Sequence, residues 1–375
     1  MIIIYSITVI IVVLYALMIA AFTLSWIKAP IVECDHVQKQ TEELVSFSVL
    51  IPFRNEEKHI EGILSDIESQ SYPFSKFEVI LINDDSDDHS LDVVRSYLSS
   101  SKLDYKIVQS DGGKKKAVET GLKQVRNEFI VSLDADVRIG KDLLQCYAFS
   151  FVNNDAKLIA APVAFNDSQG LLSKLFSLEF MSLIVSGAAA INMAKPLMLN
   201  AANMAFKRSV VVEFLEQVYQ SDVPSGDDQF LMEAIEHKYG AASIHFLKSK
   251  QAIATTNAPE SIRAFFHQRV RWASKTSSYT SWFSKWVAIL VFLINMLLLI
   301  SFLSAAISQF AAPFLGLYLL KTLIDLPILF HATKFFGKQK LLFLFPFIQF
   351  IYPWYIGIVA VWSLFGNYTW KGREY

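Results

Sequence analysis

An uncharged apolar run at the amino end limits most strongly what this chain can fold into. The run extends from Ile2 to Ile27 without an Asp, Glu, Lys or Arg. A helix of that length, which rises about 1.5 Å per residue, can cross a hydrocarbon layer of roughly 30 Å. A cleaved signal peptide would begin with basic residues and have a shorter apolar core, whereas this run starts at once and continues through Trp26. We therefore expect a transmembrane anchor.

The carboxyl-terminal part of the sequence is also rich in apolar residues. Residues 286–307 and 310–331 are each long enough to cross a bilayer, and a third apolar segment covers residues 341–365. Lys321 and Asp325 lie within the second of these segments, one helical turn apart, so they can neutralise each other. We expect a structural ion pair, with a functional pair of intramembrane charges as the alternative.

The lysines predict the sidedness of the membrane helices. Cytoplasmic loops carry an excess of Lys and Arg, which places Lys275, Lys285 and the cluster at residues 334–340 on the cytoplasmic side. A straight final crossing would leave the basic tail outside. Because Pro346 and Pro353 interrupt the last apolar segment, we predict that this segment re-enters or folds back and leaves the tail cytoplasmic.

Composition excludes one class of partner. The chain has 34 Lys+Arg against 35 Asp+Glu, which gives no indication of nucleic-acid binding. Its 53% hydrophobic content exceeds the usual soluble range of about 45–50% and agrees with membrane segments. The two cysteines, Cys34 and Cys146, provide no disulfide framework and no zinc motif. We expect them to be ordinary small side chains in a reducing compartment.

From Phe47 onward, short apolar strands alternate with helical segments, which predicts a parallel sheet. The expected strands are residues 48–52, 77–82, 105–108, 128–133 and a segment near 160–163. The expected helices cover residues 60–67, 91–98, 117–125, 230–235 and 261–275. A long apolar segment at residues 171–193 carries only Lys174 and Glu179 as charged residues. We expect it to lie in the bilayer interface, with a buried core helix as the alternative.

Two carboxylates follow the fourth of these strands. Asp134 and Asp136 come where the strand at residues 128–133 ends in a loop, and ligand sites of open α/β sheets lie at that edge. Two residues apart on an extended chain, the carboxylates point to the same side. Their oxygen donors suit Mg²⁺ or Mn²⁺ with substrate phosphates completing the coordination shell. For an isolated Asp-x-Asp, a solvated turn is the alternative.

The helix expected at residues 261–275 carries a second group of polar side chains. Gln268, Arg271 and Trp272 lie at positions i, i+3 and i+4 and therefore share one face, whereas Arg269 is expected to point elsewhere. This shared face makes the three side chains candidate site residues. An amphipathic helix resting on the membrane is the alternative.

Several motifs occur together in one order and spacing. They are Ile51-Pro-Phe-Arg-Asn55-Glu56, Asn83-Asp84-Asp85-Ser86-Asp87-Asp88, Gly113-Lys114, Asp134-Ala-Asp136, Asn200–Arg208, Gly226-Asp227-Asp228 and Gln268–Trp272. In this combination, residues 47–275 resemble family 2 glycosyltransferases of the membrane-embedded branch, which includes polysaccharide synthases and ceramide-glucosyltransferase-like enzymes. The resemblance implies an α/β fold of GT-A type, a Rossmann-like nucleotide-sugar-binding domain, joined to α-helical transmembrane segments.

The expected domain plan has five parts. They are an anchor, a connector, a cytoplasmic GT-A domain with interfacial helices, a transmembrane region and a tail, at residues 1–27, 28–46, 47–285, 286–366 and 367–375.

The resemblance assigns donor binding to the first half of the motifs. Asp136, supported by Asp134, would hold a Mg²⁺ or Mn²⁺ ion that neutralises the departing diphosphate. Lys114 would add a positive charge there, although a solvated basic run is the alternative for residues 114–116. The other substrate-binding positions are Pro52, Arg54, Glu56 and Asp84, of which the last two would hold the nucleoside.

One motif departs from the commoner family pattern Asp-Asp-Gly-Ser. Asn83 occupies the position of the first Asp, and Asp85 occupies that of the Gly. Both adjoin Asp84, so the departure leaves the exact nucleoside contacts open.

The resemblance also supplies the catalytic groups. Asp228 matches the base that takes the proton from the attacking acceptor hydroxyl. Asp227 replaces the commoner Glu and is a substrate-binding position. A helix N-terminal acid that interacts with the helix dipole is the alternative for Asp228. Arg271 would contact the diphosphate, and Gln268 and Trp272 would bind substrate, with the indole near the acceptor.

The implied activity is inverting transfer of a sugar from a UDP- or GDP-linked donor to a membrane lipid or lipid-linked acceptor at the bacterial inner (plasma) membrane. A processive polysaccharide synthase is an alternative, but about three to four carboxyl-terminal apolar segments are few for a polymer channel. A non-catalytic nucleotide-binding subunit of a membrane assembly is another, disfavoured because Asp136, Asp228 and Arg271 are all present. The expected partners are the nucleotide-sugar, the acceptor and the bilayer.

Overall fold

The computed structural model describes residues 2–34, 44–110, 112–166, 170–215, 226–274, 281–308, 311–365, 369–370 and 373–374. The chain forms two compact units, which we name the membrane unit and the sheet unit. The membrane unit consists of Met1–Ala29, Asp167–Ala190 and Ala258–Tyr375, and the sheet unit of Pro30–Asn166 and Ile191–Asn257. Two helices that the domain plan grouped with the sheet, those expected near residues 171–193 and 261–275, therefore fall mainly in the membrane unit.

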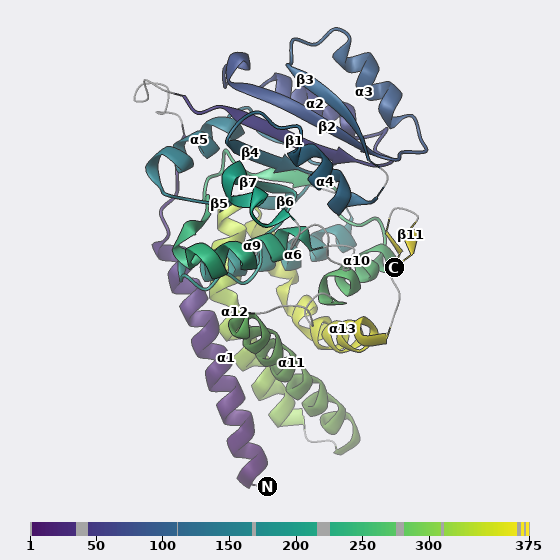
Figure 1. The fold of residues 1–375 in the computed structure, drawn as a ribbon. Coiled ribbons are helices and arrows are strands. Elements are labelled where there is room, and N and C mark those ends of the chain that lie inside the picture. Colours follow the sequence, from purple (N-terminus) through teal and green to yellow (C-terminus); the bar gives the residue numbers. More distant parts are fainter. Residues whose placement is uncertain are drawn as a thin grey trace. The chain divides into compact units, whose positions relative to one another are not determined.

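A seven-stranded sheet forms the centre of the sheet unit (Figure 1). Its strands are β1 Phe47–Phe53, β2 Phe77–Asp84, β3 Tyr105–Ser110, β4 Phe129–Leu133, β5 Leu158–Ala160, β7 Asn203–Lys207 and β8 Ile244–Phe246, in the spatial order β3-β2-β1-β4-β7-β5-β8. β1 pairs in parallel with β2 and β4, whereas β7 is antiparallel to both of its neighbours. The sheet is therefore mixed, whereas we expected a parallel sheet. β6 Val163–Phe165 and β9 Ala254–Thr256 pair separately, in parallel.

The sheet unit also contains α-helices and short 3₁₀ helices. They are α2 Ile60–Glu68, η2 Phe74–Lys76, α3 Ser90–Leu98, α4 Lys114–Leu122, α5 Leu143–Asn153, α7 Arg208–Val212, α9 Asp227–Tyr239 and η3 Ala241–Ser243. β1 and β2 are buried along their whole length, as expected for strands covered on both faces. α4 approaches β1 closely, since a Cβ at Gly121 would lie 2.5 Å from Leu50 Cδ2. Leu231 and Ile235 of α9 extend the same apolar core.

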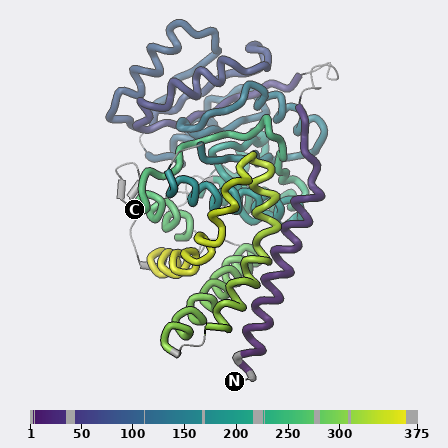
Figure 2. The backbone as a smooth tube through the Cα atoms, turned by 180° about the vertical axis from the view of Figure 1, so that it is seen from behind, coloured from purple at the N-terminus to yellow at the C-terminus, as the bar shows by residue number. Residues whose placement is uncertain are grey.

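The membrane unit consists mainly of long apolar helices. Its elements are α1 Ile2–Lys28, α6 Leu171–Asn192, α10 Ile262–Ala273, α11 Trp282–Ser308, α12 Ala311–Phe335, η5 Gln339–Leu344, α13 Phe345–Phe365, β10 Thr369–Trp370 and β11 Arg373–Glu374. Among the described residues, 5 helices are long and apolar enough to cross a membrane, and they include all the predicted spans. Figure 2 shows α1, α11 and α12 packed side by side.

Two of these helices differ from the others. In an apolar stretch of 18 residues within α6, 67% is buried, against 22–28% in the corresponding stretches of the other four helices. This burial agrees with the core-helix alternative for α6. We expected Pro353 to interrupt the last apolar segment, but α13 continues through this proline. The part of α13 labelled in Figure 1 runs across the direction of α11 and α12. The sidedness of the helices and of the tail stays a prediction.

The ion pair predicted within α12 is confirmed. Lys321 Nζ lies 2.7 Å from Asp325 Oδ2. Asp325 Oδ1 also accepts a 2.7 Å hydrogen bond from the Tyr15 hydroxyl of α1, and Lys321 donates to Gln349 Oε1 of α13 at 3.2 Å. The pair therefore links three helices, which is the structural role that we expected.

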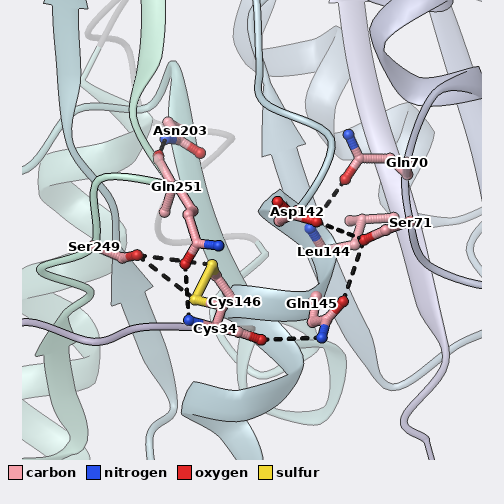
Figure 3. Close-up of a disulfide and its surroundings, with 11 residues drawn as sticks. Cys34, Gln70, Ser71, Asp142, Leu144, Gln145, Cys146, Asn203, Ser249 and Gln251 are labelled. Carbon is pink, nitrogen blue, oxygen red and sulfur yellow. Dashed lines mark hydrogen bonds between the residues drawn. A yellow bond between two sulfur atoms is a disulfide. The ribbon is translucent and has the colours of Figure 1, made fainter. Parts of the chain in front are cut away.

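The expectation for the cysteines is wrong. Cys34 and Cys146 form a disulfide, with Cα atoms 5.2 Å apart (Figure 3). The Cys34 N–H donates to Gln251 Oε1, and the Cys34 carbonyl accepts from Gln145 Nε2. These contacts hold residues 30–34 against α5. Because the two cysteines are 112 residues apart, their spacing gave no indication of pairing, and the argument for a reducing compartment no longer holds.

Candidate active site

The chain order of the strands creates a switch point between β1 and β4. β2 and β3 follow outward on one side of β1, and the chain then returns to place β4 on its other side. Ligands of open α/β sheets bind at the carboxyl ends of the strands at such a point. The predicted site residues Arg54, Glu56, Asp134 and Asp136 follow these two strands, and Asp84 ends β2. Pro52 is buried within β1 opposite Ile82, where it packs in the sheet.

Lys114 and Asp134 meet at this switch point. Lys114 is the first residue of α4, and its Nζ contacts Asp134 Oδ1. The lysine side chain is 24% exposed and that of the aspartate 30%, so the pair is partly shielded from water. This lysine is therefore directed at a carboxylate of the candidate site, and the solvated-run alternative does not describe it.

Asp84 fixes the turn from which Lys114 emerges. Its side chain is 2% exposed, and Oδ1 accepts a 2.8 Å hydrogen bond from the Gly113 N–H. Gly113 has φ 86°, a conformation that glycine adopts without steric cost. The carboxylate expected to bind the nucleoside thus also has a structural contact, and its role toward a nucleoside stays a prediction.

Asp136 has a partner that the sequence did not reveal. The Thr256 hydroxyl donates to Asp136 Oδ2 at 3.1 Å. Thr256 ends β9, and a backbone bridge between Arg138 and Thr255 holds β9 beside the segment that follows Asp136. The hydroxyl restricts the orientation of this carboxylate before any ligand binds.

Asp134 and Asp136 form a two-carboxylate donor set. No cluster of three or more His, Cys, Asp or Glu side chains able to hold a metal ion occurs among the described residues. Two carboxylates at one strand end fit a Mg²⁺ or Mn²⁺ ion that takes its remaining ligands from phosphate and water, which is how Mg²⁺ commonly binds at phosphate-transfer sites. The donor set therefore fits a cation that arrives with a diphosphate.

The loops after β1 and β2 are joined by hydrogen bonds. Arg54 donates to the carbonyl of Asp84 at 2.8 Å, and the Asp87 N–H donates to Asn55 Oδ1 at 3.0 Å. Asn55 and Asp85 have φ 53° and 55°, in the left-handed region where glycine is favoured. The backbone at Asp85 therefore explains why the commoner family pattern has a glycine there.

Asp88 and Glu57 tie the same two loops together. Asp88 Oδ2 accepts from the Glu57 N–H at 3.1 Å, and Oδ1 accepts from the Ser90 N–H at 2.9 Å. Burial raises the pKa of Asp88, but the hydrogen bonds from Ser90 and Glu57 outweigh burial and leave the pKa below its ordinary value. An ionised Asp88 thus stabilises this edge of the site.

Glu56 is buried beneath these loops. It is 5% exposed, and Oε2 lies 2.8 Å from His59 Nδ1. The other ring nitrogen of His59 lies 3.3 Å from Asn257 Nδ2. Neither His59 nor Asn257 was expected at the site, because neither belongs to a recognisable motif. The role of Glu56 toward a nucleoside stays a prediction.

α9 begins close to the start of α4. Lys115 Nζ lies 4.9 Å from the centroid of the Phe230 ring, so the first turns of the two helices are neighbours. Asp228 lies in that first turn and accepts from the Gln229 N–H at 2.8 Å. Asp227 is the first residue of α9, and its side chain lies outside the described residues. The structure thus brings the helix start that carries Asp228 near the helix start that carries Lys114.

Two family models match this chain. The model described as Glycosyl transferase family 2 matches residues 48–205. The model described as Glycosyl transferase family group 2 matches residues 129–365, which is more than half of the chain. The chain belongs to the family 2 glycosyltransferases. The second match runs from β4 into α13, so α6, α11, α12 and α13 lie within the family pattern.

Named relatives of this glycosyltransferase match parts of their own length. Poly-beta-1,6-N-acetyl-D-glucosamine synthase of Staphylococcus aureus (strain COL) is 26% identical over 242 residues, which cover 62% of this chain and 55% of the synthase. Poly(ribitol-phosphate) beta-N-acetylglucosaminyltransferase TarS of Staphylococcus aureus (strain Mu50 / ATCC 700699) is 35% identical over 105 residues, or 27% of this chain and 18% of TarS. The chain therefore spans little more than half of the synthase.

A solved structure resembles the glycosyltransferase over nearly all of its length. The mannosyltransferase PcManGT from Pyrobaculum calidifontis, in complex with GDP-Man and Mn²⁺, has a TM-score of 0.56 and 17% identity. The likeness covers 96% of this chain and 99% of PcManGT. It is a likeness of fold, and it confirms the expected GT-A architecture.

The predicted helix-face motif of the glycosyltransferase lies on α10. Gln268, Arg271 and Trp272 belong to the membrane unit, so their meeting with the carboxylates of the sheet unit stays a prediction. We expected Arg269 to point away from this motif, and this expectation is wrong. Arg269 Nη1 donates to Gln268 Oε1 at 2.8 Å, and its guanidinium carbon lies 4.1 Å from the centroid of the Trp272 ring. Helical spacing misplaced Arg269 because it considers only where the side chain starts, whereas the guanidinium at its end contacts Gln268 and Trp272.

Proposed function

We propose that this chain transfers a sugar from a nucleotide-sugar to an acceptor at the membrane. The contact between Lys114 and Asp134, two residues before Asp136, carries the proposal. Phosphate oxygens need positive charge and a divalent cation needs oxygen ligands. An ammonium group beside two carboxylates meets both needs, so a diphosphate and a cation fit together at the end of β4.

Asp136 and Asp134 would hold the Mg²⁺ or Mn²⁺ ion, which when bound would supply positive charge to the leaving diphosphate. Lys114 would neutralise a second part of the phosphate charge, and Asp84 would keep Lys114 in place through Gly113. Thr256 would orient Asp136. The Mn²⁺ and GDP-Man of PcManGT support this donor set in a protein of the same fold.

Asp228 would act as the general base for the acceptor. A sugar-accepting hydroxyl loses its proton as its oxygen attacks the anomeric carbon, and a carboxylate within hydrogen-bond reach can take that proton. The neighbouring starts of α4 and α9 support this role, because they bring Asp228 to the side of the sheet where Lys114 lies. Arg271 would contact the diphosphate, and Gln268 and Trp272 would bind substrate, as the family motif that they match implies.

The acceptor that we favour is a lipid or lipid-linked molecule, because the carboxyl-terminal part offers α11, α12 and the segment that contains α13 as candidate spans, few for a polymer channel. A processive polysaccharide synthase is the second candidate. The similarity to a poly-N-acetylglucosamine synthase supports that alternative.

A donor screen tests the proposal. The full chain in native membrane vesicles would be supplied with UDP- and GDP-linked sugars and Mg²⁺ or Mn²⁺, and the released nucleotide and the products would be measured by mass spectrometry. We expect one donor class to be consumed and a lipid to gain a single sugar. A ladder of long products would favour the processive alternative. If no donor is consumed, the transferase proposal is wrong and the non-catalytic subunit is favoured.

A further inference from the structure

Glu179 of α6 and Arg269 of α10 form a buried ion pair within the membrane unit. Arg269 is 3% exposed and Glu179 is 8% exposed. Arg269 Nε donates to Glu179 Oε1 at 3.0 Å, and Nη2 donates to Oε2. These two parallel bonds fix the plane of the guanidinium. The desolvation cost of such a buried pair can exceed its Coulombic gain, so stability alone gives little reason for its presence.

The remaining nitrogen of this guanidinium holds Gln268, the first motif residue of α10. Nη1 donates to Gln268 Oε1 at 2.8 Å. Because a guanidinium group only donates hydrogen bonds, the Gln268 amide must turn its oxygen toward Arg269. Its NH₂ group is then the end directed away from Arg269. Gln268 is thereby set up as a hydrogen-bond donor toward a substrate oxygen.

Aromatic rings of α6 and α10 enclose the pair. The rings of Phe176 and Phe265 are stacked, with centroids 4.0 Å apart and planes at 5°. The Arg269 guanidinium carbon lies 4.5 Å from the Phe265 centroid and 4.1 Å from the Trp272 centroid. Phe180 approaches Trp272 with centroids 6.1 Å apart. A cation between two rings stabilises both of them, so the pair also limits the orientations open to the Trp272 indole.

We propose that Glu179 and Arg269 are positioning residues for sugar transfer. Glu179 fixes Arg269, and Arg269 fixes Gln268 as a donor and Trp272 as a rigid surface for the acceptor. The inference rests on the proposed function, from which the substrate roles of Gln268 and Trp272 come. It assigns to α6 a part in the reaction although α6 carries none of the family motifs that the sequence revealed.

Two conservative variants test this inference. Arg269→Lys keeps the charge opposite Glu179, but one ammonium group cannot reproduce the fork that holds Glu179 and Gln268 together. Glu179→Asp keeps its charge and withdraws the carboxylate by one methylene. Arg263→Lys is the matched control, because Arg263 lies on α10 with an exposed side chain. The full chain would be used in detergent or nanodiscs, with turnover expressed per nucleotide-binding site so that unfolded molecules do not count.

Turnover and nucleotide binding are expected to separate. We expect kcat per site to fall about tenfold in Arg269→Lys and Glu179→Asp, the loss of roughly one oriented hydrogen bond. We expect the Kd of UDP or GDP to change less than about twofold, since both variants keep Lys114, Asp136 and Arg271, the groups proposed to bind the diphosphate and its cation. Arg263→Lys should match the wild type in both measurements. Wild-type turnover per site in both altered proteins would overturn the inference.

A readout without turnover separates failure of the inference from failure of the proposed function. Acrylamide quenching of Trp272 fluorescence would be obtained as the difference between each protein and its Trp272→Phe form. We expect more quenching in Arg269→Lys than in the wild type or Arg263→Lys. If the wild type consumes no donor, the proposed function fails, and unchanged quenching in Arg269→Lys would then refute the positioning role by itself.

Discussion

Lys114 Nζ contacts Asp134 Oδ1 and thereby joins the first turn of α4 to the carboxyl end of β4. α4 lies directly on β1, the strand beside β4, and its start is fixed from the other side by the bond between Asp84 and Gly113. The charged groups proposed to bind a diphosphate and its cation are therefore assembled by the fold before either ligand arrives. Preorganised charge of this kind is effective because it requires no reorganisation during the reaction.

Lys114→Gln should lower kcat/KM for the nucleotide-sugar by about 10²–10³-fold, the loss expected when a preorganised group at developing charge is removed. Lys116→Gln is the control, because Lys116 lies on the same helix and is exposed. It should remain within about twofold of the wild type, as is usual for surface changes. Steady-state kinetics on both proteins decide the matter, and equal losses would assign the effect to the net charge of α4.

Thr256→Val should weaken activation by Mn²⁺ about 10–100-fold, because partners that orient a metal-binding carboxylate typically contribute that much. The substitution removes the hydroxyl that donates to Asp136 and keeps the branched shape. Thr255→Val is the matched control, since alternate residues of a strand point to opposite sides. The Mn²⁺ concentration for half-maximal activity would be measured. Equal values in the two variants would show that the hydroxyl does not position Asp136.

Asp228→Asn should abolish turnover and preserve nucleotide binding, because the amide keeps the size of the side chain but cannot accept the acceptor's proton. Released nucleotide and the Kd of UDP or GDP would be measured on the same preparation. Asp155→Asn, at a carboxylate that is 83% exposed, controls for loss of an acidic charge. Retained turnover in Asp228→Asn would mean that another group is the base.

Cys34→Ser should lower the free energy of unfolding of the sheet unit by about 4–5 kcal/mol, which is the loop-closure entropy for a cross-link between residues 112 apart. Denaturant unfolding in detergent without reductant measures the difference. In excess dithiothreitol the wild type and the variant should unfold alike. A difference that persists under reduction would show that the serine, and not the missing bond, causes the loss.

The parts of the fold that depend on local pattern could be predicted from the sequence. β4 begins with the apolar residues 129–131, and Asp134 and Asp136 follow the strand, so both the strand and the carboxylates at its end were expected. The long apolar helices were expected because burial in lipid requires length and the absence of charge, both of which a sequence displays. The ion pair of Lys321 with Asp325 is equally local, because the two residues lie one helical turn apart in the sequence.

Features made by distant residues could not be predicted in the same way. Thr256 lies 120 residues from Asp136, and nothing in its neighbourhood sets it apart from an ordinary strand threonine. β7 is short and antiparallel, without the two-residue turn that reveals a hairpin. The Cys34–Cys146 bond depends on where the fold places residues 30–34. Arg269 was assigned from the direction of its Cα–Cβ bond, whereas its guanidinium lies several bonds away.

The most direct test of the central claim is electron paramagnetic resonance of Mn²⁺ titrated into the full chain in the presence of UDP or GDP. The claim is that the carboxylates at the end of β4 hold a divalent cation together with a nucleoside diphosphate. We predict one tightly bound Mn²⁺ per chain that requires the nucleotide, an affinity at least about tenfold weaker in Asp136→Asn, and an unchanged affinity in the exposed control Asp155→Asn. Equal Mn²⁺ affinity in Asp136→Asn and the wild type would contradict the claim.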